Sequence, residues 1–325
     1  MCTVALVFPE SFAYLAEKIN RELEKHGFSV ETVLSEGPIT KEIKRALFEE
    51  VHIYVTGGIE RVTGEDLENA RFLKLVQRFG AGYENVDCEA AALRGIYVAN
   101  IPGVNADSVA DLTIGLIISL ARHIVTADTL LREGVWRFWI GHELAGKVLG
   151  IFGLGAIGKA VALRALAHGM KVIAYDIQPD LEFAKTHNVQ WVSKEELLKT
   201  ADIITIHMPL TEETRDFISE PELNIMKPTA YLVNTSRGGL VNQVALVKAL
   251  RERRIAGAAL DVFPEEPLPR DAEILKLDNV VLTPHIGGST FEALERLARV
   301  VIENCLRVKQ GEHPLYVVNR PRGIF

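Results

Sequence analysis

Hydrophobic and polar residues follow two alternating patterns along the chain. Residues 4–8 form a short, unbroken apolar run, which is typical of a buried strand. In residues 12–23 apolar side chains recur at steps of three and four, which predicts an amphipathic helix that Gly27 closes. Further strand candidates lie at residues 51–55, 73–79 and 96–99, and each is preceded by a helical stretch. This repetition predicts a parallel sheet with helices on both faces.

A second series of strands is predicted in the rest of the chain, at residues 148–152, 171–175, 203–207, 231–234, 258–260 and 280–283. Between the two series, Ile101-Pro102-Gly103 predicts a hinge. The segment from Asp107 to about Leu131 predicts one long helix that is apolar nearly all round near residues 114–120, and it is therefore expected to be buried between domains or subunits. Near the C-terminus, Ser289 and Glu292 have the spacing of a capping box that opens a last helix.

The length of 325 residues predicts two domains, since a domain usually holds about 100–200 residues. We expect an α/β protein with two doubly wound, parallel-sheet (Rossmann-like) domains and a cleft between them. The chain is expected to cross near Ile101 and to return near Ser289. The predicted domains are therefore residues 1–100 plus 289–325, and residues 101–288.

Composition narrows the function classes. A hydrophobic fraction of 48% and a charged fraction of 24% are typical of a globular protein, and the net charge of -7 argues against nucleic acid and anionic membranes as partners. Cys2, Cys88 and Cys305 lie far apart, which predicts neither a disulfide framework nor a zinc site. Acidic Glu10 soon after the first apolar run argues against a signal peptide, so the expected location is the cytoplasm.

A glycine-rich turn follows the strand predicted at residues 148–152. Residues 153–158 read GLGAIG and open a helical stretch at residues 156–168. In a dinucleotide-binding turn, Gly153 would allow the tight turn, Gly155 the approach of a pyrophosphate, and Gly158 the packing of helix on strand. The free N–H groups at the start of the helix would then bind the phosphates.

An acid completes this fingerprint. Asp176 ends the next predicted strand, 18 residues after Gly158. Its carboxylate is expected to accept hydrogen bonds from the adenosine ribose hydroxyls. A 2′-phosphate would meet this negative charge, and Ile177, Gln178 and Pro179 offer no cation to offset it. The sequence therefore predicts NAD rather than NADP.

Three further segments follow predicted strands of the second series. They are NTSRGG at residues 234–239, LDVFPEEP at 260–267 and PHIGGS at 284–289. Because the carboxyl ends of the strands form the ligand crevice of a doubly wound sheet, Arg237, Glu266 and His285 are expected to converge there. Each residue alone has a plain structural explanation, and Glu265 is expected to be merely solvated. Their joint occurrence favours catalysis.

Together with the glycine turn and Asp176, these segments resemble the signature motifs of the D-2-hydroxyacid dehydrogenases, over about residues 51–311. The resemblance implies NAD-dependent hydride transfer between nicotinamide and a small 2-oxo or 2-hydroxy acid of D configuration, with Arg237, Glu266 and His285 as catalytic residues. For His207, a packing role is an equal alternative to a cofactor contact. The implied cofactor-binding residues are Gly153, Gly155, Ala156, Ile157, Gly158, Asp176, His207, Pro209, Thr235, Ser236, Asp261, Gly287 and Gly288.

The chemistry of that reaction requires these residue types. Arg237 can bind the substrate carboxylate in bidentate geometry. His285 can donate or accept a proton near neutral pH. Glu266 can hold the imidazole in place and stabilise its charged form.

A loop of the first series supplies the expected substrate contact. Residues 79–87 resemble the family's substrate loop, in which the N–H groups matching Ala81 and Gly82 bind the carboxylate, although the same pattern fits an ordinary glycine turn. Glyoxylate or hydroxypyruvate is the expected substrate. 3-Phosphoglycerate is an alternative substrate. Two features weaken it: Gly57-Gly58 stands where phosphoglycerate dehydrogenases carry a phosphate-binding arginine, and the C-terminal regulatory extension of the longer ones is missing. Arg61 and Arg78 are nearby in the sequence.

The same residues bear on other functions and on partners. A formate-type dehydrogenase pairs its histidine with an amide, so Glu266 argues against it. A non-catalytic, NAD-binding corepressor-like module stays open. No metal site is expected. The resemblance implies a homodimer, with the helix after Asp107 and a loop carrying Trp136 and Trp139 in its interface. The two tryptophans either reach toward the partner's substrate pocket or only pack in the interface.

Overall fold

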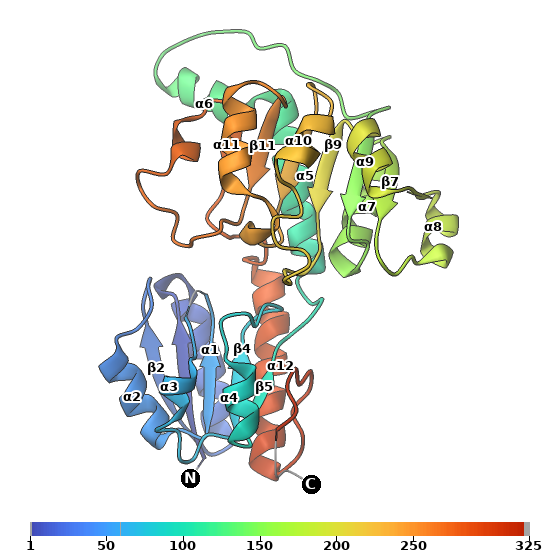
Figure 1. Cartoon of the computed structure of the whole chain (residues 1–325). Helices are drawn as coiled ribbons and strands as arrows, with labels where there is room; N and C mark the ends of the chain where they lie inside the picture. Colours follow the sequence, from blue (N-terminus) through green and yellow to red (C-terminus); the bar gives the residue numbers. More distant parts are fainter. Residues whose placement is uncertain (1, 59, 322–325) are drawn as a thin grey trace. The chain divides into compact units, whose positions relative to one another are not determined.

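The computed structural model describes residues 2–58 and 60–321 and separates the chain into two compact units. The first unit comprises Met1–Asn105 and Ser289–Phe325, and the second comprises Ala106–Gly288. In Figure 1 the blue-to-cyan segments and the red helix α12 (Phe291–Gln310) belong to the first unit. The green-to-orange segments belong to the second.

The first unit is built on a five-stranded parallel sheet in the order β2-β1-β3-β4-β5. Side chains alternate between its faces: Leu6 packs with α1 and α12, whereas Val7 packs with α2, α3 and α4. Both faces are therefore covered, as the pattern predicted. The elements besides α12 are β1 (Cys2–Phe8), α1 (Ala13–Lys25), β2 (Phe28–Leu34), α2 (Lys41–Glu50), β3 (Ile53–Thr56), α3 (Gly64–Leu67), β4 (Leu75–Arg78), α4 (Cys88–Leu93) and β5 (Tyr97–Ala99).

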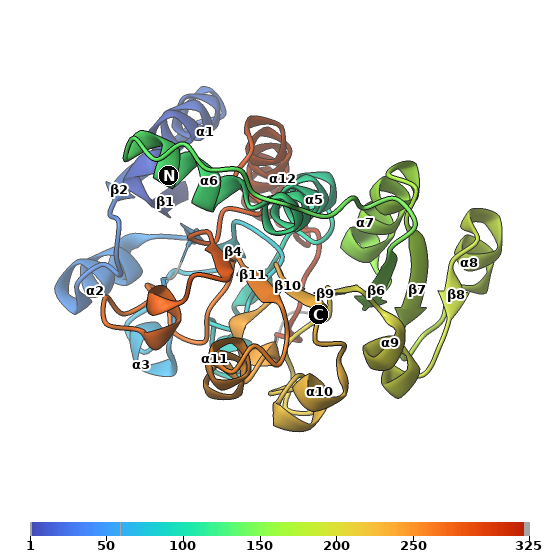
Figure 2. The same cartoon turned by 90° about the horizontal axis from the view of Figure 1, so that it is seen from above.

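The second unit contains a seven-stranded parallel sheet in the order β12-β11-β10-β9-β6-β7-β8. Helices α5 and α7 cover one face, and α9, α10 and α11 cover the other (Figures 1 and 2). The strand order reverses at β6, between β9 and β7, which makes this the topological switch point. The elements are α5 (Ala106–Arg122), α6 (Ile124–Arg132), β6 (Val148–Phe152), α7 (Ala156–Ala167), β7 (Lys171–Tyr175), α8 (Leu181–His187), β8 (Gln190–Trp191), α9 (Lys194–Thr200), β9 (Ile203–Ile206), α10 (Glu220–Ile225), β10 (Tyr231–Asn234), α11 (Gln243–Arg251), β11 (Gly257–Leu260) and β12 (Val280–Leu282).

The prediction of one long helix from Asp107 to about Leu131 was wrong. His123 adopts a left-handed conformation with φ 54°, which separates α5 from α6 with a bend of 64°. Only α5 is buried, whereas Ile124 and Val125 of α6 are exposed. Hydrophobic periodicity continues through such a break, because one residue can change direction without altering the pattern. Within the described residues no single helix is long and apolar enough to cross a membrane; the bent pair α5–α6 meets that test only by length and composition.

Two smaller predictions also need correction. Strand β2 was missed because it is an edge strand in which only Phe28 is buried, so it lacks a continuous apolar run. The capping box at Ser289 was wrong: Thr290 caps α12, and its hydroxyl oxygen accepts a hydrogen bond from the Ala293 N–H at 3.2 Å. Ser289 and Thr290 are both capable caps, and spacing alone did not distinguish them.

Candidate active site

The glycine turn lies at the switch point of the second sheet, where the strand order reverses. Gly153 has a φ of +89°, and a Cβ atom there would lie 2.6 Å from the carbonyl oxygen of His207. A Cβ atom on Gly158 would lie 2.1 Å from the carbonyl oxygen of Gly153. Gly155 precedes α7, and among the described residues nothing lies within 4 Å of an added Cβ. Two glycines thus allow close packing and the third leaves its surroundings open, which fits a dinucleotide phosphate.

Asp176 lies beside this turn, at the end of β7. Its Oδ2 accepts a hydrogen bond from the Leu154 N–H at 2.8 Å, and its Oδ1 accepts one from the Gln178 N–H at 3.0 Å. The carboxylate is therefore anchored next to the phosphate-binding turn, where the ribose of a dinucleotide is expected.

The remaining predicted residues of the second unit also follow strands of its sheet. His207 and Pro209 follow β9; Thr235, Ser236 and Arg237 follow β10; Asp261 and Glu266 follow β11; His285, Gly287 and Gly288 follow β12. Because all strands are parallel, these residues share one edge of the sheet with the glycine turn. Ala81 and Gly82 belong to the first unit and follow β4.

The turn that carries Arg237 is built by Asn234, a residue that the sequence did not single out. The buried Asn234 side chain accepts a hydrogen bond from the Ser236 N–H at 3.0 Å and donates one to the Arg237 carbonyl at 2.8 Å. The Ser236 hydroxyl donates to the Met208 carbonyl at 2.6 Å, which fastens the turn to the segment after β9. The available signal was an Asn directly before Thr-Ser-Arg, since Asn side chains often hydrogen-bond backbone two residues on.

Gly238 brings this turn against the segment that leads to Glu266. A Cβ atom at Gly238 would lie 1.9 Å from the carbonyl carbon of Phe263 and 2.4 Å from the nitrogen of Pro264. No residue with a side chain fits such an approach between two backbones. The close contact places the backbones that carry Arg237 and Glu266 side by side.

Asp261 organises the loop that carries His285. Its buried carboxylate accepts hydrogen bonds from the Thr283 hydroxyl at 2.6 Å, the Ile286 N–H at 2.9 Å and the Gly287 N–H at 2.8 Å. Its carbonyl oxygen accepts a fourth, from the His285 N–H at 2.8 Å. These bonds hold His285 at a φ of 55°, a conformation that non-glycine residues seldom adopt. Asp261 was expected to contact the cofactor, and here its carboxylate binds the histidine loop.

His285 and Glu266 form a hydrogen-bonded pair. The Nδ1 atom of His285 lies 2.7 Å from Oε2 of Glu266, whose Oε1 accepts a hydrogen bond from the Phe263 N–H at 2.9 Å. With Nδ1–H directed at the carboxylate, Nε2 is the nitrogen that can exchange a proton with a ligand. Within the described residues Nε2 has no hydrogen-bond partner. The histidine side chain is 53% exposed and the glutamate 21%, so the pair is open to a small molecule.

The two members of this pair alter each other's pKa. Desolvation alone would lower the pKa of His285, but the hydrogen bond and charge of Glu266, helped by Asp261, raise it above its usual value. For Glu266, desolvation would raise the pKa of the carboxyl, and His285, the Phe263 N–H and Arg237 together lower it. Arg237 also acts on His285 and opposes its protonation. The three predicted catalytic residues therefore lie within electrostatic reach of one another.

We predict that Glu266→Gln lowers the pKa of His285, because the amide keeps a hydrogen-bonding group but loses the charge. In the oxo-acid reduction that the sequence resemblance implies, the imidazolium donates the proton, so kcat/KM for reduction falls as the pH rises through the pKa of His285. The alkaline limb of the kcat/KM profile, measured with saturating NADH, should move to lower pH in the variant. An unmoved limb would show that Glu266 does not tune the proton donor.

His207 packs beneath the glycine turn. Its N–H donates to the Phe152 carbonyl at 2.7 Å, and its Nε2 lies 2.9 Å from the Thr205 hydroxyl. Burial lowers the pKa of His207 to about 3, so the ring is neutral at physiological pH. These contacts favour a packing role for His207. A contact between His207 and the cofactor stays a prediction.

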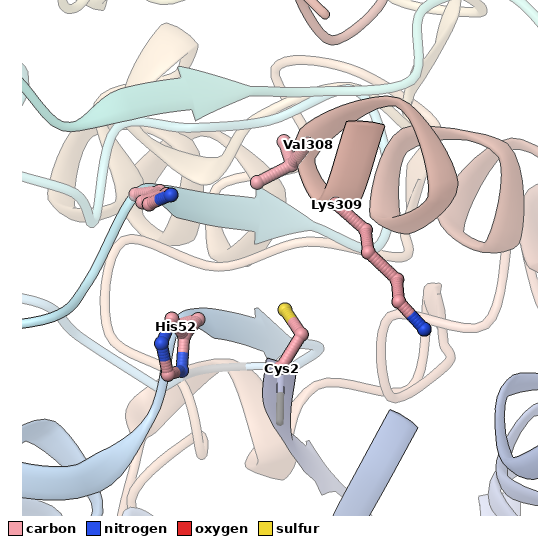
Figure 3. Close-up of a pocket in the computed structure, with 5 residues that line it drawn as sticks. Cys2, His52, Val308 and Lys309 are labelled. Atoms are coloured by element: carbon pink, nitrogen blue, oxygen red, sulfur yellow. The ribbon is translucent and has the colours of Figure 1, made fainter. Parts of the chain in front are cut away.

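A separate cavity of about 310 Å³ lies in the first unit and contains none of the predicted site residues. Cys2 and His52 line it from neighbouring strand segments, and Lys309 extends from α12 (Figure 3). Two of its polar side chains bind the chain itself: His52 Nδ1 lies 2.8 Å from the Thr3 hydroxyl, and Lys309 donates to the Gly27 carbonyl at 3.0 Å. This cavity is distinct from the candidate active site.

Known proteins match this chain over most of its length. The family model for the NAD-binding domain of D-isomer specific 2-hydroxyacid dehydrogenases matches residues 114–287. A protein named glyoxylate reductase from Thermococcus litoralis is 46% identical over 280 residues, which cover 83% of this chain and 84% of the relative. One of the same name from Korarchaeum cryptofilum is 42% identical over 305 residues, with 92% of each chain covered. The solved TT0316 protein from Thermus thermophilus has a TM-score of 0.89 at 36% identity, covering 98% of this chain and 100% of that one.

The fold and the site together define an NAD-dependent oxidoreductase, with a glycine turn and an acid at the switch point of a parallel sheet and a His–Glu pair on the same edge. The chain belongs to the family of D-isomer specific 2-hydroxyacid dehydrogenases. It therefore transfers a hydride between nicotinamide and a 2-oxo or 2-hydroxy acid.

Proposed function

We propose that this enzyme reduces glyoxylate with NADH and accepts hydroxypyruvate as a second substrate. The observation that carries the reaction type is the His285–Glu266 pair, 2.7 Å apart and within electrostatic reach of Arg237. The choice of glyoxylate is supported by relatives of 42% and 46% identity that carry the name glyoxylate reductase.

In this proposal the second unit binds NAD and the first unit contributes to the substrate site. NADH, when bound, supplies the hydride that reduces the carbonyl carbon of the oxo acid. Arg237 holds the substrate carboxylate through paired N–H donors. His285 Nε2 gives its proton to the carbonyl oxygen as the hydroxyl forms, and Glu266 stabilises the imidazolium that precedes this step.

The cofactor contacts form part of the same proposal, and the geometry of the turn supports them. The first N–H groups of α7, at Ala156 and Ile157, suit the pyrophosphate. Asp176 suits the ribose. The other proposed cofactor contacts are Gly153, Gly155, Gly158, His207, Pro209, Thr235, Ser236, Asp261, Gly287 and Gly288.

The arrangement favours glyoxylate over the alternative substrates. Arg78 is buried and donates hydrogen bonds to the carbonyls of Gly82 at 3.1 Å and Gly58 at 3.1 Å, an environment unlike that of a phosphate ligand. This argues further against 3-phosphoglycerate. His285 is paired with the carboxylate of Glu266 and not with an amide, which argues against formate oxidation.

Turnover of NADH with a panel of glyoxylate, hydroxypyruvate, pyruvate and 3-phosphohydroxypyruvate tests the proposal. We expect the highest kcat/KM with glyoxylate. A preference for the phosphorylated acid would replace glyoxylate by 3-phosphoglycerate chemistry. NADH binding without turnover of any oxo acid would instead support the corepressor-like module.

We further propose that the enzyme is a cytoplasmic homodimer. Trp136, Phe138 and Ile140 have 79%, 88% and 93% of their surface exposed, which is unusual for large apolar side chains in one short segment and favours a protein contact. A second copy of the chain is the proposed cover, and light scattering should give the mass of two chains. The free thiols of Cys2, Cys88 and Cys305 suit a reducing compartment.

A further inference from the structure

The loop after β4 is fastened to the first unit by three successive carbonyl oxygens. The Gly80 carbonyl accepts a hydrogen bond from the Ile101 N–H at 2.8 Å. The Ala81 carbonyl accepts one from Nδ2 of Asn100 at 2.7 Å, and the Gly82 carbonyl accepts one from Nε of Arg78 at 3.1 Å. Arg78 is the last residue of β4, and Asn100 and Ile101 directly follow β5. These two strands are neighbours in the sheet (Figure 1).

These bonds determine where the N–H groups of the loop point. In a trans peptide the carbonyl of one residue and the N–H of the next lie on opposite sides of the peptide plane. A carbonyl held toward residues 100–101 therefore turns the following N–H away from them. The N–H groups of Ala81 and Gly82, which follow the Gly80 and Ala81 carbonyls, have no acceptor among the residues that the structure describes, and neither has the N–H of Tyr83, which follows the carbonyl held by Arg78. They are available to an anionic ligand.

Asn100 contributes the one side-chain amide among the three anchors. It is 8% exposed, and its backbone N–H donates to the Tyr316 carbonyl at 3.2 Å, so the residue is fixed independently of the loop. Its Nδ2 bond holds the peptide plane between Ala81 and Gly82. Rotation of that plane would direct a carbonyl oxygen, in place of the Gly82 N–H, toward an incoming carboxylate.

We propose that Asn100 is a positioning residue for the substrate carboxylate, acting through the orientation of the Gly82 N–H, with Arg78 as the second anchor of the loop. The proposal rests on the proposed function, in which the loop binds a 2-oxo acid. Asn100 itself does not touch the substrate.

The test is Asn100→Leu, which keeps the size and branching of the side chain and removes the donor. One lost hydrogen bond predicts a rise in KM for glyoxylate of roughly tenfold. Because the loop binds the carboxylate in ground state and transition state alike, kcat should change less than KM. The dissociation constant of NADH should not change. Asn100→Ser, which is uncharged and too short to reach the Ala81 carbonyl, should act in the same direction and serves if the leucine variant does not fold.

Asn319→Leu is the matched control. The Asn319 amide donates to the Ile96 carbonyl at 2.8 Å and accepts from the Val98 N–H at 2.8 Å, at the opposite end of β5 from Asn100. This variant should lower Tm while leaving KM unchanged. Equal KM values for the Asn100 variants and wild type, or an equal rise in the control, would overturn the positioning role alone. A wild-type protein that turns over no oxo acid would contradict the proposed function, and this proposal with it.

Discussion

Arg237→Ala should lower kcat/KM for glyoxylate on the order of a thousandfold, because the substrate carboxylate then enters a site without its cation. NADH binding should stay nearly intact, since the glycine turn and Asp176 lie after other strands. The turn itself should persist, because the two Asn234 bonds to the backbone of Ser236 and Arg237 remain when the guanidinium bond to the Ser236 carbonyl, at 2.7 Å, is lost. Steady-state kinetics and NADH titration measure the two effects separately.

Arg237→Lys refines this test. An ammonium restores the charge but not the planar pair of donors, so only part of the lost activity should return. Arg251→Ala, which removes a surface arginine paired with Glu273 at 2.6 Å, should leave both measurements unchanged. Near-normal catalytic efficiency in Arg237→Ala would remove Arg237 from the substrate site.

The strands around the switch point were predicted most closely. Those at residues 148–152, 171–175 and 231–234 match β6, β7 and β10, because each is a short apolar run in a buried sheet. Prediction failed where an element lacked that signal. Strand β2 is largely exposed, and the break at His123 depends on one backbone conformation that the apolar pattern does not record.

The candidate site was predicted as a set of strand ends, but not as a network. Motif order indicated that Arg237, Glu266 and His285 follow three strands of one sheet. It could not indicate that Gly238 contacts the backbone of Phe263, because that approach depends on the tertiary register of two loops. The roles of Asp261 and Asn100 as anchors were equally hidden, since both act through hydrogen bonds to residues distant in sequence.

His285→Asn should reduce kcat for glyoxylate by about two to four orders of magnitude, the usual contribution of a positioned proton donor. Asparagine is the suitable replacement because His285 has a φ of 55°, a conformation that asparagine tolerates better than most residues. The alkaline limb of the kcat/KM profile should disappear with the imidazole. His168→Asn, at an exposed histidine after α7, should leave kcat unchanged.

The double variant decides whether Glu266 acts through His285. If the carboxylate serves only to orient and charge the imidazole, Glu266→Gln should cost little additional activity once His285→Asn has removed the ring, because the effects of residues that act as a unit are not additive. If Glu266 also met the substrate directly, the two losses would multiply. The 2.7 Å bond to Nδ1 and the second bond from the Phe263 N–H occupy both carboxylate oxygens, which favours the first outcome. Multiplicative losses would therefore contradict the assignment of Glu266 as the partner of His285.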